Sequence, residues 1–135
     1  MRKYSTNYQF VDIAEVHAIH RAIINQAGTN AEVRDFALLH SAVERPKATY
    51  QGKWLYPTLF LKAAALLQSI CLNHAFTDGN KRTAWLSCKR FLYLNNFSLN
   101  APVSEAVKFM VIVDNKKPEV KMIAKWLKRY SIELR

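Results

Sequence analysis

The stretch 74–82, HAFTDGNKR, gathers an imidazole, a carboxylate, an amide, an ammonium and a guanidinium around a single glycine. A helix start exposes unpaired backbone amides and the positive end of the helix dipole, so a glycine-containing turn that leads into a helix can bind an anion. Gly79 allows the backbone to approach a phosphate closely, and the next three side chains add an amide and two cations. The sequence therefore predicts a phosphate-binding site formed by Gly79, Asn80, Lys81 and Arg82.

Three other side chains complete a candidate catalytic site. Asp78 places a carboxylate beside the phosphate site, as expected where Mg²⁺ bridges the two, because this ion takes one or two protein carboxylates and fills its other positions with phosphate oxygens and water. His74 can serve as the general base for an attacking hydroxyl, and Phe76 is interpreted as an apolar anchor for the loop. The residues alone leave an alternative open, in which the cluster is a solvated Asp-Gly turn and His74 only caps a helix.

Helical periodicity on both sides makes this stretch the junction of two core helices. The preceding helix opens with Pro57 in its first turn, and the following helix runs from Asn80 to a stop at Asn95 and Asn96. The apolar stripes of the two helices are formed by Phe60, Ala63, Ala64, Leu67, Ile70 and Cys71, and by Ala84, Trp85, Cys88, Phe91 and Leu92.

Four further helices follow from capping signals. A first helix lies between Asp12 and Gly28, a second between Asp35 and Pro46, a fifth runs from Pro102 through Val113, and a sixth begins at Pro118. The residues expected to face inward are Val16, Ile19, Ile23, Ile24 and Ala27 in the first, Phe36, Leu39, Ala42 and Val43 in the second, and Val120, Ile123, Ala124, Leu127 and Tyr130 in the sixth. The sequence thus predicts an all-α bundle of about six helices in one domain, 1–135, with segment 47–57 as a loop or a small β hairpin.

Charge and composition narrow the class of protein. Lys and Arg number 20 against 10 Asp and Glu, and residues 46–100 carry seven basic residues and one acidic residue. Such a field favours an anionic partner, which can be a nucleic acid, a nucleotide or an acidic protein face. No apolar run approaches the roughly 20 residues that span a bilayer, so we expect a cytoplasmic protein.

Several residues outside the junction have two interpretations. Cys71 and Cys88 are predicted to be buried free thiols rather than a disulfide or metal site. His17 and His20 are expected to be solvated or hydrogen-bonded, since no third metal ligand accompanies them. The basic residues of the sixth helix form either a solvated surface or a nucleic-acid contact; they are Lys121, Lys125, Lys128 and Arg129.

The order of residues in the junction resembles the HxFx(D/E)xN(G/K)R signature of the Fic/Doc family. Segments 34–46, RDFALLHSAVERP, and 56–76, YPTLFLKAAALLQSICLNHAF, also resemble helices of the Doc, or death-on-curing, toxins. Ala75 departs from the pattern, because many relatives have proline there. The resemblance implies a Fic fold, a mostly helical bundle whose two central helices flank the active loop, and transfer of part of a nucleotide to a protein hydroxyl.

The resemblance also implies a role for each residue. His74 would activate the acceptor hydroxyl and Asp78 would hold Mg²⁺, while residues 79–82 would bind the phosphates of ATP. The hairpin at 47–57 would align the acceptor segment through Lys53, Trp54 and Tyr56.

Lys81 matches the Doc-like ending NKR. That ending implies an ATP-dependent protein kinase that acts on a threonine of translation elongation factor Tu, whereas the ending GNGR implies an AMP transferase. The chain contains no (S/T)xxxE(G/N) segment for inhibition in cis, so the resemblance implies a separate antitoxin whose C-terminal segment folds into a hydrophobic groove. A non-catalytic protein that binds nucleic acid is the alternative of a different class.

Overall fold

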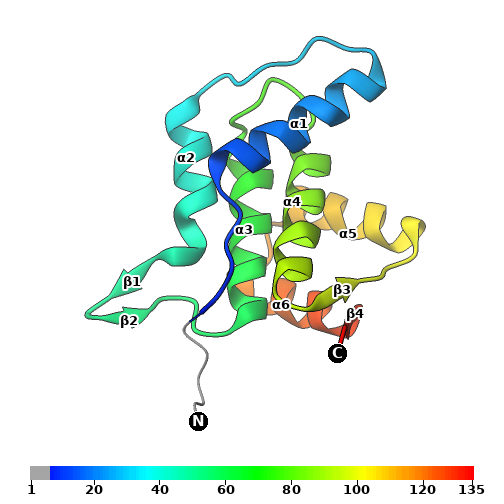
Figure 1. Cartoon of the computed structure of the whole chain (residues 1–135). Helices are drawn as coiled ribbons and strands as arrows, with labels where there is room; N and C mark the ends of the chain where they lie inside the picture. Colours follow the sequence, from blue (N-terminus) through cyan, green and yellow to red (C-terminus); the bar gives the residue numbers. More distant parts are fainter. Residues whose placement is uncertain (1–6) are drawn as a thin grey trace.

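The computed structural model describes residues 7–135, and within this range six α-helices carry the fold (Figure 1). The helices are α1 (Ile13–Ala27), α2 (Phe36–Glu44), α3 (Leu59–Asn73), α4 (Asn80–Leu94), α5 (Val103–Lys116) and α6 (Val120–Arg129). A single 3₁₀ turn, η1 (Arg45–Lys47), follows α2. The prediction of a mostly helical bundle is confirmed.

Helix α3 forms the centre of the bundle and packs against α2, α4 and α6. Figure 1 shows α3 and α4 side by side, with α2 on the other side of α3 and α1 crossing near the loop that joins α3 to α4. The inner positions of α3 are rich in alanine, which lets neighbouring helices approach its backbone closely. The loop after α3 is therefore carried by the most buried helix of the protein.

The predicted caps of α1 and α2 form, whereas α3 and α6 begin later than expected. The side chain of Asp12 accepts a hydrogen bond from the amide of Glu15, and Gly28 ends α1 in the left-handed region at φ +72°. Asp35 caps α2 in the same way. Pro57 was expected in the first turn of α3, but Thr58 caps this helix instead, so the proline precedes the cap. Its fixed φ is compatible with either position. Pro118 was expected to begin the sixth helix, but α6 begins at Val120, after Glu119.

Three predicted features of the helices are wrong in detail. Phe36 is 58% exposed because it lies at the very start of α2, where it contacts His17 edge to face instead of entering the core. Ala27 is exposed in the last turn of α1. Helix α5 continues past Val113 to Lys116, where Lys117 ends it in a left-handed conformation. Such end effects depend on tertiary contacts that periodicity does not record.

Segment 47–57 forms the hairpin rather than the loop. Strands β1 (Thr49–Tyr50) and β2 (Lys53–Trp54) pair antiparallel. Both residues of the connecting turn, Gln51 and Gly52, have positive φ, as a two-residue hairpin turn requires. The buried ammonium of Lys62 on α3 holds the hairpin's base, because it donates a hydrogen bond to the Tyr56 carbonyl and lies 3.9 Å from the centroid of the Trp54 ring.

A second strand pair was not predicted. Strand β3 (Phe97–Leu99) follows α4 and pairs antiparallel with β4 (Ser131–Glu133), which follows α6. The strands are three residues long and their pairing is non-local, so the sequence carries no hairpin signal for them. They tie the end of α6 to the end of α4.

Two expectations drawn from composition concern the cysteines and the length and polarity of the helices. Cys71 and Cys88 are both buried and free, as predicted. Within residues 7–135, every helix is too short or too polar to cross a bilayer.

Candidate active site

The junction between α3 and α4 begins at His74, whose own backbone ends α3. His74 has φ +51° and ψ +46°, a left-handed conformation that stops the helix, and its side chain is exposed to solvent. The guanidinium of Arg34 donates a hydrogen bond to the His74 carbonyl. His74 is thus presented at the surface while its backbone is held by the chain that precedes α2.

That preceding segment supports the next part of the loop as well. The amides of Arg34 and Asp35 donate to the Ala75 carbonyl at 2.7 and 3.2 Å, and the Thr77 amide donates to the Glu32 carbonyl at 3.0 Å. Between these bonds, an isolated antiparallel bridge pairs Val33 of this segment with Phe76 of the loop. Because these pairings satisfy backbone groups that would otherwise be left without partners, they fix the path of the loop.

Phe76 and Asn80 lock the loop from inside. Phe76 is buried, and its backbone N–H donates to the Asn80 side-chain oxygen at 3.2 Å. The Asn80 side-chain nitrogen donates in return to the Phe76 carbonyl at 2.9 Å. The side chain of Asn80, which was expected to bind phosphate, therefore braces the loop, and its backbone amide is left available to an anion.

The start of α4 leaves several amides available. Gly79 has φ +83°, a backbone conformation that favours glycine. Its amide N–H donates a hydrogen bond to the Oδ1 atom of the neighbouring Asp78 at 2.8 Å. The Gly79 carbonyl accepts the first helical hydrogen bond from Thr83. The N–H groups of residues 80–82 precede that bond, and no side chain within residues 7–135 caps them. This is the arrangement that binds anions at helix N-termini.

The charged side chains of the junction lie at its surface. Asp78 and Arg82 are both exposed. Lys81 is half exposed, and its ammonium lies 3.5 Å from a carboxylate oxygen of Asp114 on α5. His74 and Asp78 therefore lie on the loop, and Arg82 follows in the first turn of α4, with all three residues exposed. The lysine is directed towards α5.

The hairpin residues are not brought to this loop. Helix α2 leads away from the junction and α3 leads back to it, so the hairpin lies at the opposite end of α3 (Figure 1), and a helix of 15 residues is about 22 Å long. Lys53 is exposed, Trp54 packs against Phe10, and the Tyr56 hydroxyl accepts a hydrogen bond from Arg45. The role expected for this hairpin, to align an acceptor at His74, stays a prediction.

A residue that the sequence interpretation did not connect with the site lies under the loop. His20 on α1 is 1% exposed, its ring stacks on Phe76 with centroids 3.7 Å apart, and its Nε2 atom lies 2.9 Å from the Asp78 carbonyl. Desolvation by burial lowers the pKa of His20. Its position one turn after Val16, on the apolar face of α1, was the signal that could have identified it as an inner residue.

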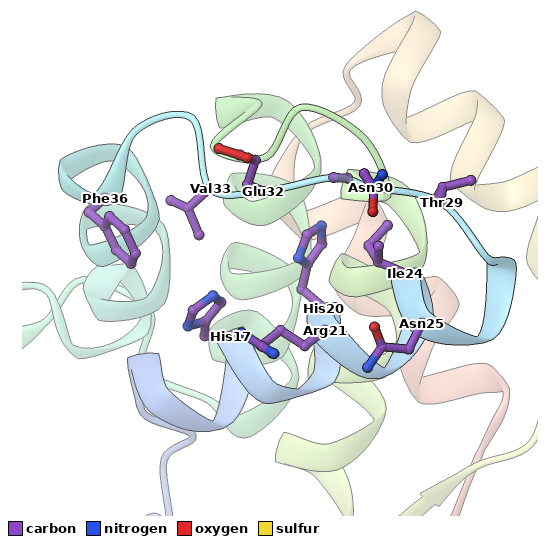
Figure 2. A pocket seen from close by; sticks show the side chains of 11 residues that line it. His17, His20, Arg21, Ile24, Asn25, Thr29, Asn30, Glu32, Val33 and Phe36 are labelled. Atoms are coloured by element: carbon purple, nitrogen blue, oxygen red, sulfur yellow. The ribbon is translucent and has the colours of Figure 1, made fainter.

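His20 also borders a cleft between α1 and segment 29–36. The cleft has a volume of about 590 Å³. Figure 2 shows His17, His20 and Arg21 projecting from α1 beside Glu32 and Asn30 of that segment. The residues that line the cleft do not include His74.

Comparison with known proteins agrees with this geometry. A sequence model of the Fic/DOC family matches residues 10–92, a range that runs from α1 into α4 and includes the whole junction. The chain belongs to the Fic/DOC family. The resemblance seen in the sequence is therefore confirmed. Toxin Doc of Mycolicibacterium smegmatis is 54% identical over 74 residues, which cover 55% of this chain and 57% of that protein. The similarity to this Fic/DOC relative thus extends over little more than half of each chain.

Proposed function

We propose that this protein is a Doc-type toxin that transfers the γ-phosphate of ATP to a hydroxyl of a protein. One observation carries the proposal: a single braced loop presents an exposed imidazole, an exposed carboxylate and the open amides of a helix start. Membership of the Fic/DOC family and the identity to a protein named Toxin Doc support it. The acceptor proposed from the sequence resemblance is a threonine of translation elongation factor Tu, whose modification would arrest translation.

In the proposed reaction His74 takes the proton of the acceptor hydroxyl. The hydroxyl oxygen forms a bond to the γ-phosphorus while the bond from that phosphorus to the bridging oxygen of ADP breaks, and ADP leaves. The amides at the start of α4 and the Arg82 guanidinium would bind phosphate oxygens and offset their charge. The exposure of His74 fits this role, because a macromolecular acceptor must reach it.

Asp78 fits the requirements of a Mg²⁺ ligand. One of its carboxylate oxygens is engaged by the Gly79 amide at 2.8 Å, which orients the group and leaves the second oxygen for a metal. A single protein carboxylate is sufficient for Mg²⁺ that also binds phosphate oxygens and water. The ion would neutralise phosphate charge and orient the nucleotide.

Lys81 supports phosphate transfer over AMP transfer. A glycine at this position would permit close backbone contact with one orientation of the triphosphate, whereas a lysine side chain adds bulk and charge. Its ammonium lies beside Asp114, so it borders the start of α4 on the α5 side. We propose that the lysine favours the nucleotide orientation that presents the γ-phosphate to the acceptor.

ATP labelled separately at its α or γ phosphate tests this function. The protein is incubated with elongation factor Tu and ATP that carries label at either the α or the γ position, and the acceptor is analysed for label. Transfer from the γ position is expected, and transfer from the α position would instead establish an AMP transferase. If neither label is transferred while the protein binds nucleic acid through the lysines of α6, the binding alternative is correct.

The matched variants for this assay are H74N and H40N. Asparagine tolerates the left-handed backbone of residue 74 better than alanine does, so H74N removes the imidazole and leaves the loop in place. His40 is an exposed histidine on α2 and receives the same substitution as a control. Label transfer should be lost in H74N and retained in H40N.

We also propose that the antitoxin segment binds in a groove between α4 and α5. The groove has a volume of about 380 Å³ and an apolar floor that includes Trp85 and Met110. Val103 and Val107 lie one helical turn apart on α5 and are 81% and 58% exposed, so an apolar stripe continues from the groove to the surface. Exposed apolar residues in such a row are typical of a helix-in-groove interface.

Charge complementarity decides the kind of partner for this groove. Three basic residues, Lys81, Arg82 and Lys89, line it together with the apolar floor, and the whole chain has a formal net charge of +10. An acidic amphipathic helix fits such a surface, whereas a second copy of this basic chain would add like charges. Because Lys81 and Arg82 also belong to the proposed phosphate site, an occupant would cover part of that site.

The groove is tested by binding of the purified antitoxin, measured by calorimetry. The variant V107E places a carboxylate in the apolar stripe and is expected to weaken binding by more than tenfold, because it buries a charge in the interface. The control V111T changes a neighbouring position on the same helix without adding a charge. Equal affinities for V107E and the wild type would place the antitoxin elsewhere.

A further inference from the structure

A side chain of another helix, α1, supports the loop that carries the proposed catalytic groups. His20 of α1 lies against three residues of the loop. Its ring stacks on Phe76 with an angle of 10° between the planes, and its Nε2 atom lies 2.9 Å from the carbonyl oxygen of Asp78. The ring also lies beside Gly79. A β-carbon added to Gly79 would lie 3.5 Å from the imidazole, in ordinary van der Waals contact. No other residue of α1 makes a hydrogen bond to this loop within the described part of the chain.

The hydrogen bond determines which nitrogen of His20 carries the proton. A carbonyl oxygen only accepts, so the Nε2 atom must be the donor to Asp78. The ring cannot turn over without losing either this bond or the stacking on Phe76. His20 is therefore held in one orientation by two different interactions.

Asp78 is in turn held at two points. Its backbone carbonyl accepts the bond from His20, and its Oδ1 atom accepts the bond from the Gly79 amide. The remaining Oδ2 atom is the one available for a ligand. Because the main chain and one carboxylate oxygen are both fixed, the direction of the second oxygen depends on where His20 places the carbonyl.

We propose that His20 is a positioning residue for the phosphate-transfer site, which fixes the Asp78 carboxylate and the glycine turn through the Asp78 carbonyl. The inference rests on the proposed function. His20 does not touch the nucleotide, and it acts through Asp78. A side chain of this kind holds the groups of the site in the geometry that the reaction needs, without taking part in the reaction.

Two substitutions separate the stacking of His20 on Phe76 from its hydrogen bond to Asp78. H20F keeps a flat ring for stacking on Phe76 and removes the donor, whereas H20Q offers an amide N–H to the carbonyl and removes the ring. His17 lies one turn earlier on the same helix and contacts Phe36 instead of the loop, so H17F and H17Q are matched controls. Circular dichroism and thermal unfolding establish that each variant is folded.

The first readout is hydrogen exchange of the loop amides and does not depend on activity. In H20F the amides of residues 76–79 are expected to exchange about tenfold faster, because a hydrogen bond of ordinary strength corresponds to a change of that size. Exchange in α3 should be unchanged, and H20Q should restore most of the protection. Loop exchange in H20F equal to that of the wild type and of H17F would overturn the proposal.

The second readout is kinetic. H20F is expected to raise the KM for Mg·ATP about tenfold and to leave the KM for the acceptor unchanged, since only the nucleotide site is displaced. A loss of folded protein would instead lower the apparent kcat and leave both KM values unchanged, and that result would also overturn the proposal. If the wild type transfers no phosphate, the proposed function fails, and the exchange measurement still decides whether His20 positions the loop.

Discussion

Substituting Gly79 by alanine tests whether the backbone of the glycine turn is part of the site. Gly79 has φ +83°, and an L-residue with a β-carbon is strained by about 1–2 kcal/mol in this region. The new β-carbon would lie 3.4 Å from a methyl carbon of Ile24 and 3.5 Å from His20, which are ordinary contacts. The expected loss of stability is therefore about 1–2 kcal/mol, which comes from the backbone and not from a clash.

Gly28 supplies the matched control. It also has a left-handed backbone, with φ +72°, and a β-carbon added there would have no neighbour within 4 Å. G28A should therefore lose a similar amount of stability, and both variants should unfold roughly 3–8 °C below the wild type. Differential scanning calorimetry measures this shift. A much larger loss in G79A than in G28A would show that the contact distances at Gly79 are not tolerated.

Activity should distinguish the two variants. Relaxation of the strain rotates the backbone away from positive φ; at Gly79 this displaces the amides that open α4, whereas at Gly28 it moves only an exposed turn. Phosphate transfer is expected to fall at least about tenfold in G79A, which corresponds to about 1.4 kcal/mol in the barrier, and to change less than about twofold in G28A. Equal transfer rates in G79A and G28A would refute the reasoning that the turn's backbone binds phosphate.

Three further predictions concern residues outside the turn. Burial lowers the pKa of Lys62 to about 8 from 10.5, so the unfolded chain binds more protons than the folded chain between these values. Relative to K62M, the wild type should therefore gain about 1.5 kcal/mol of unfolding free energy from pH of about 8 to about 9.5. Parallel denaturation profiles would contradict this. D114N removes the carboxylate that lies 3.5 Å from the half-exposed Lys81, and it should change the unfolding free energy by less than about 1 kcal/mol in urea denaturation. Burial raises the pKa of Cys71 to about 11 and raises that of Cys88 further. Iodoacetamide at pH of about 8 should therefore modify either thiol at least about 100-fold more slowly than in the urea-unfolded chain. Rapid labelling of the native protein would show that the thiols are accessible.

The fold was largely predictable because its signals are local. Asp12 and Asp35 cap helices through their own neighbouring amides, and Gly28 ends a helix through its own backbone freedom. The apolar spacing of α3 and α4 placed the junction between two buried helices. Such features depend on residues within one or two helical turns, so a reader of the sequence has all the interacting groups in view.

The position of the hairpin relative to the junction could not be predicted from the sequence, for a different reason. Its sequence suits a two-residue turn, and the strands form as expected. Its distance from His74 depends on the direction in which α2 and α3 run, and this direction is set by packing over the whole bundle. The second strand pair, β3 with β4, was missed for the same reason, because its partners meet only after α5 and α6 have folded.

The sequence by itself determined the types and order of the chemical groups in 74–82, the helices on either side of them and the excess of basic residues. The tertiary structure decided how these groups are used. It engaged the Asn80 side chain within the loop, directed Lys81 to Asp114, and placed Arg34 and His20 against the loop from segments that lie 40 or more residues away in the chain. Side-chain identity is fixed locally, whereas hydrogen bonding and stacking between distant segments follow from the packing of the whole core.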